Sequence, residues 1–545
     1  MSVALRYHEQ TKHHFTRFAR SLGRLDWATQ PDPFRRYAGA SLVELPRRAL
    51  AAHSPYDALF ECGGVAPAPV TVESIGEFLR CSMGLSAWKQ FGASRWALRV
   101  NPSSGNLHPT ETYVVHRGRV CHYAVREHAL EERCVFTDPG EGADDVFVVG
   151  LTSIYWREAW KYGERAFRYC QHDAGHAIAA LRVAAALLGW RLALLPRWSD
   201  AQVARLLGLD READYGSAER EEPECLAVVT PRDPAAWLNE DPALLTAAAA
   251  AGTWSGTANR LSPSTVAWPI IDDVGAATRY PGNLRCGGAG VRGAEVRSTE
   301  GRTPARPHPR TPAQQPAPPA RSVILARRSA LAFDAHSGLR RDAFVAMLRR
   351  LCPGSPPWDA IDWPPQVHLV LFVHRVEGLV PGIYAYLRDP AVYSEWKAAM
   401  RQEFLWERMN DPNESNEPND PNDLFLLLPI DCRRMANRLS CDQEIAEDGF
   451  FSLAMIARLE ASLREPGEWF YRRLFWECGL IGQVLYLEAE AVGTRATGIG
   501  CFYDDPVHEM LGLTGHAWQS LYHFSMGVPV EDSRLTSERG YEWER

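Results

Sequence analysis

The sequence predicts an α+β protein built from two fused, diverged copies of one structural unit. The chain has 545 residues, which is more than a single hydrophobic core usually holds. Residues 162–209 also match residues 466–513 without a gap, at an offset of 304 positions. In both segments the apolar residues recur at helical spacing. Length, repeat and periodicity together indicate two large lobes of the same origin.

The repeat is specific enough to exclude a chance match, because 13 of its 48 aligned positions are identical. Each copy is expected to form a long buried helix, then a short strand, then a small helix. The identical pairs include Gly163/Gly467, Glu164/Glu468, Arg168/Arg472, Gly175/Gly479, Gly189/Gly493, Arg191/Arg495 and Asp200/Asp504.

A segment of different composition separates the copies. Residues 286–320 are rich in Pro, Gly and Arg and have no apolar periodicity, so they are expected to form a tether without a core. We therefore predict a first domain over residues 1–285, a linker over 286–320 and a second domain over 321–545.

The overall composition excludes several classes of protein. A formal net charge of −8 without a basic stripe argues against nucleic-acid binding. No apolar run is long enough to cross a bilayer, so no membrane partner is expected. The 12 cysteines include no Cys-x-x-Cys pair, which favours a reducing cytoplasm, and no metal site is predicted.

The first copy contains a polar turn between a predicted helix and a strand near residues 111–115. Arg99 precedes Pro102-Ser103-Ser104, and the hydroxyls and amides of this turn can hydrogen-bond a planar polar ligand. The same residues also suit a rigid loop without any ligand.

The second copy contains two further candidate segments. Arg327-Arg328-Ser329 offers paired guanidiniums and a hydroxyl, which suit a phosphate, although such triplets are commonly solvated surface. Gly498-Ile499-Gly500 ends a predicted strand, and its glycines would let backbone amides approach a flat ring. Because the first copy has no glycine there, we expect only one copy to accept a ligand at this position.

Lys161-Tyr162 precedes the first repeat, where the second copy has Glu465-Pro466. A lysine beside a phenol can act as an acid/base pair when its surroundings shift its proton affinity. A surface lysine next to a core tyrosine is the alternative.

Taken together, these motifs resemble the nitroreductase superfamily, in particular its SagB/thiazole-oxidase-like branch of FMN-dependent dehydrogenases that act on azoline rings in modified peptides. The similarity covers nearly the whole chain. Lys161-Tyr162-Gly163-Glu164-Arg165 is similar to the Lys-Tyr signature of that branch, in which lysine and tyrosine are implicated in catalysis. The Pro102-Ser103-Ser104 turn and the Arg327-Arg328-Ser329 triplet resemble two FMN-contacting segments of nitroreductases.

The resemblance implies an intramolecular pseudo-dimer. The superfamily usually forms homodimers with FMN at the subunit interface, where one subunit supplies the arginine-serine segment and the other the Pro-Ser-Ser turn. Here the two segments lie in different copies, which implies one complete FMN site and one that is lost.

The resemblance also implies a role for each candidate residue. Arg327, Arg328 and Ser329 would bind the phosphate and ribityl end of FMN, with Arg534 as a weaker helper. Ser103 and Ser104 would contact the flavin from the facing lobe, after Arg99 and Pro102. Gly498, Ile499 and Gly500 would line the ring. Lys161 and Tyr162 would move the proton that accompanies hydride transfer.

The expected function is an FMN-dependent oxidoreductase acting on a small organic or peptide-derived substrate. One alternative is an NAD(P)H-dependent nitro or quinone reductase. Another is a flavin-binding partner protein without turnover.

Overall fold

The computed structural model describes residues 1–47, 50, 53–61, 63–139, 144–282, 317–409 and 423–544. Most of the predicted linker, residues 286–316, lies outside the described residues.

Two antiparallel sheets form the two lobes, which confirms the predicted α+β class, and six strands follow the same order in both. In each sheet the strand after the long helix lies at one edge and pairs with the strand that follows it in the chain. The first sheet runs β11 (Thr253–Trp254), β7 (Ala129–Val135), β6 (Arg119–Ala124), β5 (Thr110–His116), β8 (Phe147–Ser153), β10 (Glu222–Thr230) and β9 (Arg191–Leu194), with β2 (Ser41–Glu44) also on β7. The second runs β15 (Glu407–Arg408), β16 (Asp423–Pro429), β14 (Gly382–Leu387), β13 (Val367–Val373), β17 (Phe451–Arg458), β19 (Trp518–Gly527) and β18 (Arg495–Ile499).

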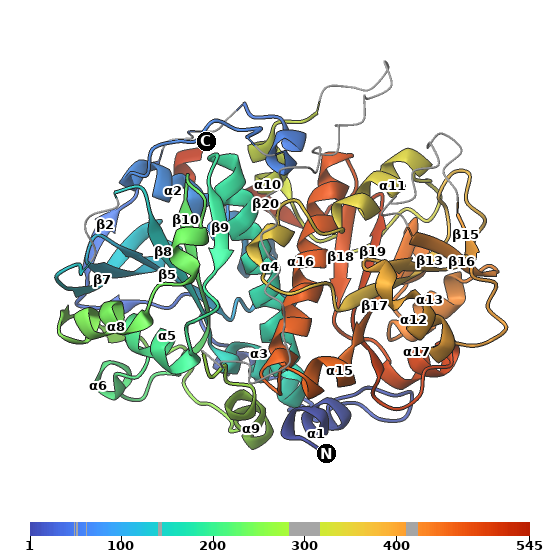
Figure 1. Cartoon of the computed structure of the whole chain (residues 1–545), viewed down its shortest axis with the longest axis horizontal. Coiled ribbons are helices and arrows are strands. Elements are labelled where there is room, and N and C mark those ends of the chain that lie inside the picture. The colour runs from blue at the N-terminus through green and yellow to red at the C-terminus, as the bar shows by residue number, and fades with distance from the viewer. Residues whose placement is uncertain are drawn as a thin grey trace.

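Two long helices lie side by side between the sheets (Figure 1). They are α4 (Ala166–Leu187) and α16 (Phe470–Ala491), each of 22 residues. Their bounds differ by the offset of 304 that the sequence repeat predicts. Because apolar residues surround both helices, they are buried almost completely, and one hydrophobic cluster continues through them from one lobe into the other.

One identical pair of the repeat, Gly175/Gly479, lies where α4 and α16 cross. A Cβ on Gly175 would stand 2.2 Å from the carbonyl oxygen of Trp476, and a Cβ on Gly479 would stand 2.3 Å from that of His172. The two backbones therefore approach closely enough to exclude any side chain at either position.

The identical Arg and Asp residues of the repeat form reciprocal ion pairs between the lobes. Arg168 Nη1 lies 2.8 Å from Asp504 Oδ1, and Arg472 Nη2 lies 2.5 Å from Asp200 Oδ2. All four side chains are buried. Such an exchange of equivalent contacts is the signature of a two-fold interface, here formed within one chain.

The small helix of each copy ends alike. Helix α5 (Asp200–Leu207) is followed by Gly208 at φ +73°, and α17 (Asp504–Leu511) is followed by Gly512 at φ +80°. A left-handed residue at this position lets the chain turn away while the last helical carbonyls remain hydrogen-bonded. This geometry accounts for the Leu-Gly-Leu that closes both copies.

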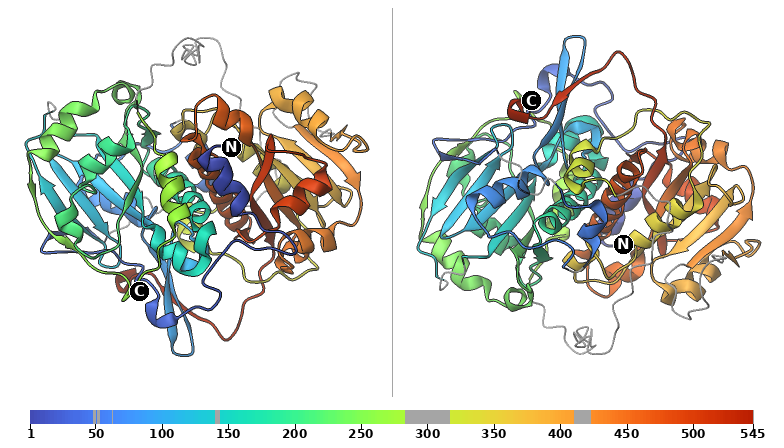
Figure 2. Two further views of the ribbon diagram at one scale, coloured as in Figure 1. Left: turned by 90° about the horizontal axis from the view of Figure 1, so that it is seen from below. Right: turned by 90° about the horizontal axis from the view of Figure 1, so that it is seen from above.

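Each terminal segment of the chain contacts the lobe that the other half of the chain forms (Figure 2). The N-terminal helix α1 (Val3–Gln10) packs on the second lobe, where His8 hydrogen-bonds Tyr471 and Gln519. Near the C-terminus, β20 (Thr536–Arg539) joins the hairpin of β3 (Leu85–Phe91) and β4 (Ser94–Arg99) on the first lobe.

The remaining helices cover the outer faces of the sheets and the ends of the central pair. In the first lobe they are α2 (Val72–Arg80), α3 (Tyr155–Tyr162), α6 (Glu212–Tyr215), α7 (Ala235–Leu238), α8 (Pro242–Ala250) and α9 (Pro269–Ala277). In the second they are α10 (Ala320–Ala326), α11 (Arg341–Arg350), α12 (Tyr393–Ala399), α13 (Arg433–Leu439), α14 (Ile445–Asp448) and α15 (Leu459–Arg464). In the first lobe, β1 (Tyr37–Ala38) also pairs with β12 (Thr257–Ala258).

Candidate functional site

A cavity of about 290 Å³ lies where the two lobes meet, and both lobes line it. The first lobe contributes residues of β3, of the turn after β4 and of α4. The second contributes the segment after α10, the end of β18 and Tyr486 and Tyr522. The predicted residues that line this cavity are Arg99, Pro102, Ser103, Ser104, Arg327, Ser329, Gly498 and Gly500.

The Pro-Ser-Ser turn is held by its own hydrogen bonds. The Ser103 hydroxyl accepts a hydrogen bond from the His108 amide at 2.8 Å and donates to Glu158 Oε1 at 3.3 Å. The Ser104 amide donates to Asp173 Oδ1 at 3.3 Å. Ser103 is thus used to close the turn, which leaves the Ser104 hydroxyl available to a ligand.

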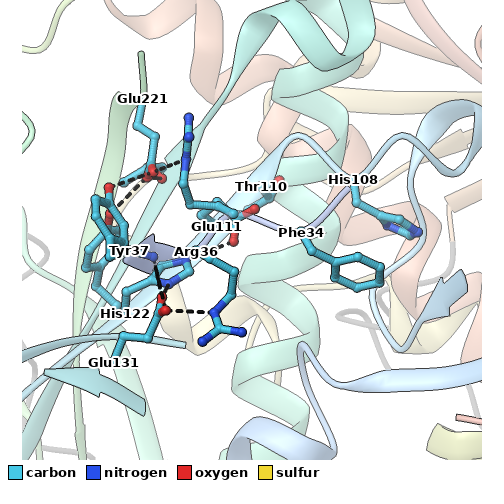
Figure 3. A network of polar contacts seen from close by, with 12 residues as sticks. Phe34, Arg36, Tyr37, His108, Thr110, Glu111, His122, Glu131 and Glu221 are labelled. Atoms are coloured by element: carbon cyan, nitrogen blue, oxygen red, sulfur yellow. Dashed lines mark hydrogen bonds and ion pairs between the residues drawn. The ribbon is translucent and has the colours of Figure 1, made fainter. Parts of the chain in front are cut away.

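A buried ionic network lies beside the turn, and Figure 3 shows the part of it around Glu111, His122 and Glu131. Arg99 donates to the Thr110 carbonyl at 3.1 Å, and Arg157 donates to the His108 carbonyl at 2.7 Å and pairs with Glu111. Burial works to lower the pKa of His122, but hydrogen bonds to Glu111 and Glu131 outweigh it and raise that pKa to about 9.

The network thus consists of charged groups that neutralise one another inside the lobe. Removing one partner of such a group leaves an uncompensated buried charge, so the network keeps the turn in one geometry.

Arg327 and Arg328 lie next to each other in sequence but line different cavities. Arg327 donates to the carbonyls of Val100 and Arg99 at 2.9 and 3.0 Å, and its buried Nη1 has no partner among the described residues. Arg328 donates to the Ser86 carbonyl at 2.6 Å and lines a neighbouring cavity of about 640 Å³. Burial, followed by the charge of Arg327, lowers the pKa of Arg328 to about 9.

The second lobe also supplies a cluster of aromatic hydroxyls. Tyr486 shares a hydrogen bond with Ser329 at 2.9 Å and accepts one from the Gly498 amide at 2.9 Å. A Cβ on Gly498 would stand 2.0 Å from the Tyr522 hydroxyl, and one on Gly500 would stand 2.3 Å from the Tyr169 ring. The absence of side chains at Gly498 and Gly500 therefore makes space for Tyr522 and Tyr169.

Lys161 and Tyr162 do not line the cavity but lie against the turn that does. From the position of a Cβ on Gly105, the Tyr162 hydroxyl is 2.8 Å away and Lys161 Nζ is 3.0 Å away. Burial, and then the charge of Glu158, raises the pKa of Tyr162. The turn, through Gly105, thus lies between Lys161 and Tyr162 on one side and the cavity on the other.

Two other predicted residues are not brought to the cavity. The Ile499 side chain is buried in the hydrophobic cluster on the outer face of the second sheet. Arg534 is exposed on the C-terminal segment, where it pairs with Asp532 at 2.7 Å.

Sequence reasoning missed a pair of buried carboxyls beside the turn. Asp173 of α4 lines the cavity, and Glu158 of α3 lies behind it. Burial raises the pKa of both groups, and the charge of Asp173 raises that of Glu158 further. The available signal was the acid at equivalent repeat positions, since Glu477 is 304 residues after Asp173.

The arrangement can hold an anion beside arginines, present hydroxyls and amides to a polar ring, and store a proton. Within the part of the chain that the structure describes, no helix is both long and apolar enough to span a membrane.

Comparisons with known proteins identify the family of the two lobes. The model of the Nitroreductase family matches residues 65–218 and 364–528, which together are more than half of the chain. A solved structure of an Anabaena variabilis protein assigned as a nitroreductase shares 21% identity with a TM-score of 0.66, and the match covers 97% of this chain and 100% of that one.

Other solved structures match less extensively. Nitroreductase A from Vibrio parahaemolyticus has 14% identity and a TM-score of 0.24, over 39% of this chain and 68% of that one. A chain of the E. coli microcin synthetase complex has 14% identity and a TM-score of 0.26, over 45% of this chain and 84% of that one. No curated protein sequence matches the chain.

The family model thus matches each half of the chain once, on the two lobes that the sequence repeat and the sheets define. The chain belongs to the nitroreductase family, whose members are oxidoreductases, and contains two copies of its domain.

Proposed function

We propose that the protein is an FMN-dependent oxidoreductase with one flavin site per chain, formed between the lobes. The observation that carries this proposal is the shared cavity, where the turn of one copy faces Arg327, Ser329 and Gly498 of the other. A bound flavin would supply the capacity to accept and release hydride.

The chemistry of the residues present fits this cofactor. The buried Arg327 Nη1 has no partner among the described residues, and Arg327 and Arg328 donate to backbone carbonyls. Burial, and then the neighbouring charge of Arg327, lowers the pKa of Arg328, so the two adjacent guanidiniums repel one another. A phosphate in the cavity would bind Arg327 through a charge-assisted hydrogen bond, and its negative charge would also offset that of Arg328, whose side chain lines the neighbouring cavity.

The residues around the cavity would divide the remaining work. The Ser104 hydroxyl and the amides of its turn would orient the polar edge of the flavin, and Tyr486 and Tyr522 would exclude water from its face. Lys161 and Tyr162 remain our candidates for proton transfer to the substrate, with Asp173 as an additional proton store beside the turn. The substrate class we favour is a small organic or peptide-derived molecule.

Flavin content tests this proposal. We expect purified protein to be yellow, and acid treatment to release one FMN per chain. The double variant Arg327→Ala/Arg328→Ala should lose most of its flavin on gel filtration, because the charge-assisted contact of Arg327, about 1.5–3 kcal/mol, and the positive charge of Arg328 beside it both disappear. Arg534→Ala, an exposed arginine outside the cavity, is the matched control and should retain it. A ratio near two, or undiminished flavin in the double variant, would contradict the proposed site.

A second candidate function is nitro or quinone reduction with NAD(P)H as the electron donor. It is favoured by the family, and it requires an open flavin face more than a particular base. Stopped-flow mixing of the flavin-loaded protein with NADPH separates the two candidates, since only the reductase should be reduced rapidly by the nicotinamide.

A further inference from the structure

Two cysteines and a histidine meet at the end of β18, next to the cavity. The Sγ atoms of Cys441 and Cys501 are 2.9 Å apart, and His13 Nδ1 lies 3.8 Å from Cys501 Sγ. Cys501 directly follows Gly500, which lines the cavity. Both cysteines are partly exposed, so small solutes can reach them.

An unusual backbone conformation holds the two thiols together. Cys441 and the following Asp442 both have φ +56°, a left-handed conformation that costs non-glycine residues energy. The side-chain amide of Gln443 donates to the Ser440 carbonyl at 2.7 Å and to the Cys501 carbonyl at 2.9 Å. The loop after α13 is therefore fastened to the end of β18 in a conformation that directs one thiol at the other.

The surroundings make the two thiols unequal. The hydrogen bond with Cys441, then that with His13, then the charge of Arg165 lower the pKa of Cys501, although burial opposes them. The same hydrogen bond, with burial, raises the pKa of Cys441. Arg165 is in turn paired with Asp504 at 2.9 Å. Cys501 is thus the better nucleophile, and Cys441 is the thiol that retains its proton.

The spacing suits a dithiol better than a metal ion. Two thiolates on a tetrahedral zinc, each at about 2.3 Å, would hold their sulfurs about 3.7 Å apart. The observed separation is 2.9 Å, and the described residues that converge here offer three ligand atoms instead of four.

We propose that Cys501 and Cys441 form a thiol–disulfide exchange site whose substrate is a low-molecular-weight disulfide. The Cys501 thiolate attacks one sulfur of the substrate, which forms a mixed disulfide and releases one thiolate. Cys441 then loses its proton and attacks Cys501 Sγ, which forms the Cys441–Cys501 disulfide and releases the second thiolate. The protein loses two electrons, and the substrate disulfide gains them.

This site is independent of the proposed flavin chemistry. Its disulfide would link the loop after α13 to the end of β18, which lines the cavity. The oxidised and reduced proteins would therefore differ at this side of the cavity.

Oxidised glutathione is the probe for the test. The full-length protein is incubated with it, alkylated under denaturing conditions, digested and analysed by mass spectrometry. We expect a Cys441–Cys501 cross-linked peptide that dithiothreitol removes. Cys441→Ser should accumulate the glutathione adduct on Cys501, and Cys501→Ser should give neither adduct nor cross-link. Cys225→Ser is the matched control, because Cys225 is also partly exposed but burial raises its pKa, and it should behave as wild type.

Alkylation of the native protein by iodoacetamide gives a second readout. In wild type, Cys501 should react on the order of tenfold faster than Cys225 near neutral pH, because it is the thiolate that reacts. His13→Ala should reduce this advantage, and circular dichroism of each variant establishes that it is folded.

Three outcomes would overturn the proposal. One is the absence of the cross-link at concentrations of oxidised glutathione that modify other cysteines. Another is equal adduct formation on Cys441 and Cys501 in the two single variants. The third is one tightly bound zinc per chain that both serine variants lose and whose removal is required before either thiol reacts.

Discussion

At the crossing of α4 and α16, the helix backbones leave no room for a methyl group. The nearest atoms to a Cβ on Gly175 belong to the backbone of Trp476, and those to a Cβ on Gly479 belong to the backbone of the other helix. A flexible side chain could move aside, but a helix backbone moves only if the lobes separate.

We expect Gly175→Ala to destabilise the protein by about 1–3 kcal/mol or more, although alanine favours a helix in isolation. Gly275→Ala is the matched control. Gly275 also lies in a helix, α9, and its Cβ would make ordinary contact with Tyr155 at 3.4 Å. The midpoints of urea unfolding report both changes, and an equal effect of the two substitutions would contradict the close crossing.

The two reciprocal ion pairs differ in their electrostatics. Burial works to raise the pKa of Asp504, but Arg165 and Arg168 outweigh it and hold that pKa well below its usual range. Burial dominates at Asp200, where Arg472 opposes it incompletely, so the pKa of Asp200 is raised. The carboxylate of Asp504 therefore stabilises the fold more than its counterpart does.

Asp504→Asn should cost about 3–5 kcal/mol near neutral pH, because two arginines lose their buried partner. Since the pKa of Asp504 is depressed in the folded state, its contribution is complete above the unfolded value of about 4 and declines as the pH falls below it. The difference in the free energy of unfolding between wild type and variant should thus become smaller by about 1 kcal/mol when the pH is lowered from about 7 to about 3.

Asp200→Asn provides the comparison for this experiment and should lower the free energy of unfolding by less than Asp504→Asn does. Urea unfolding of both variants at the two pH values measures the effects. An equal loss for the two aspartates, or a gap that does not change with pH, would contradict this assignment.

Among the elements, the turn after β4 connects three parts of the site. It lines the cavity, is supported by the buried ionic network and separates the cavity from Lys161 and Tyr162 of α3. In the proposed reaction, a proton from Lys161 or Tyr162 would therefore have to pass this turn. The carboxyl of Asp173 accepts a hydrogen bond from the Ser104 amide of the same turn.

Lys161→Ala and Tyr162→Phe should leave the protein folded and loaded with flavin. Substrate-dependent flavin reduction should slow by about 10²- to 10⁴-fold, the usual contribution of a general acid or base. Lys397→Ala is a matched control, because Lys397 lies over the ring of Tyr393 on exposed α12 and lines no part of the cavity. Stopped-flow absorbance measures the rates, and full activity of the double variant on its substrate would assign the pair a structural role.

The elements that the sequence predicted are those whose signal is local or repeated. The repeat predicted the long helix of each copy, α4 and α16, and the proline and hydroxyls predicted the turn at Ser103. The helix predicted before that turn is wrong, because the strand β4 precedes it. The contact between Arg168 and Asp504 could not be assigned from one sequence, because nothing local shows which aspartate an arginine meets 336 residues away. The roles of Ser103 and Asp173 depend on each other's position, which only the folded chain defines.

The whole molecule is a pseudo-dimer whose two copies are connected by more than the chain between them. Its contacts include the packing of α4 on α16, the reciprocal ion pairs and the exchanged terminal segments. A protein–protein interface of this kind persists without a covalent link.

Cleavage between the copies should therefore leave them associated. A specific protease site placed within residues 286–316 and then cut should give two fragments that elute together on gel filtration. In a second cut sample that combines Gly175→Ala and Asp504→Asn, the two fragments should separate at a lower urea concentration than those of the wild type. Both substitutions act at the interface. Independent elution of the cut wild-type fragments without denaturant would show that the interface depends on the connection.

The exchanged ends also constrain the order in which the protein acquires its structure during synthesis. Helix α1 is synthesised well before its partners, because His8 can form its hydrogen bond with Gln519 only after a further 511 residues have been made. At about 5–20 residues per second, that interval is on the order of half a minute or more. Throughout it, the first lobe lacks strand β20 on the edge of β3. The nascent chain therefore presents an unpaired strand edge and an undocked helix until Gln519 and β20 have been made, and it is most exposed to aggregation in this interval.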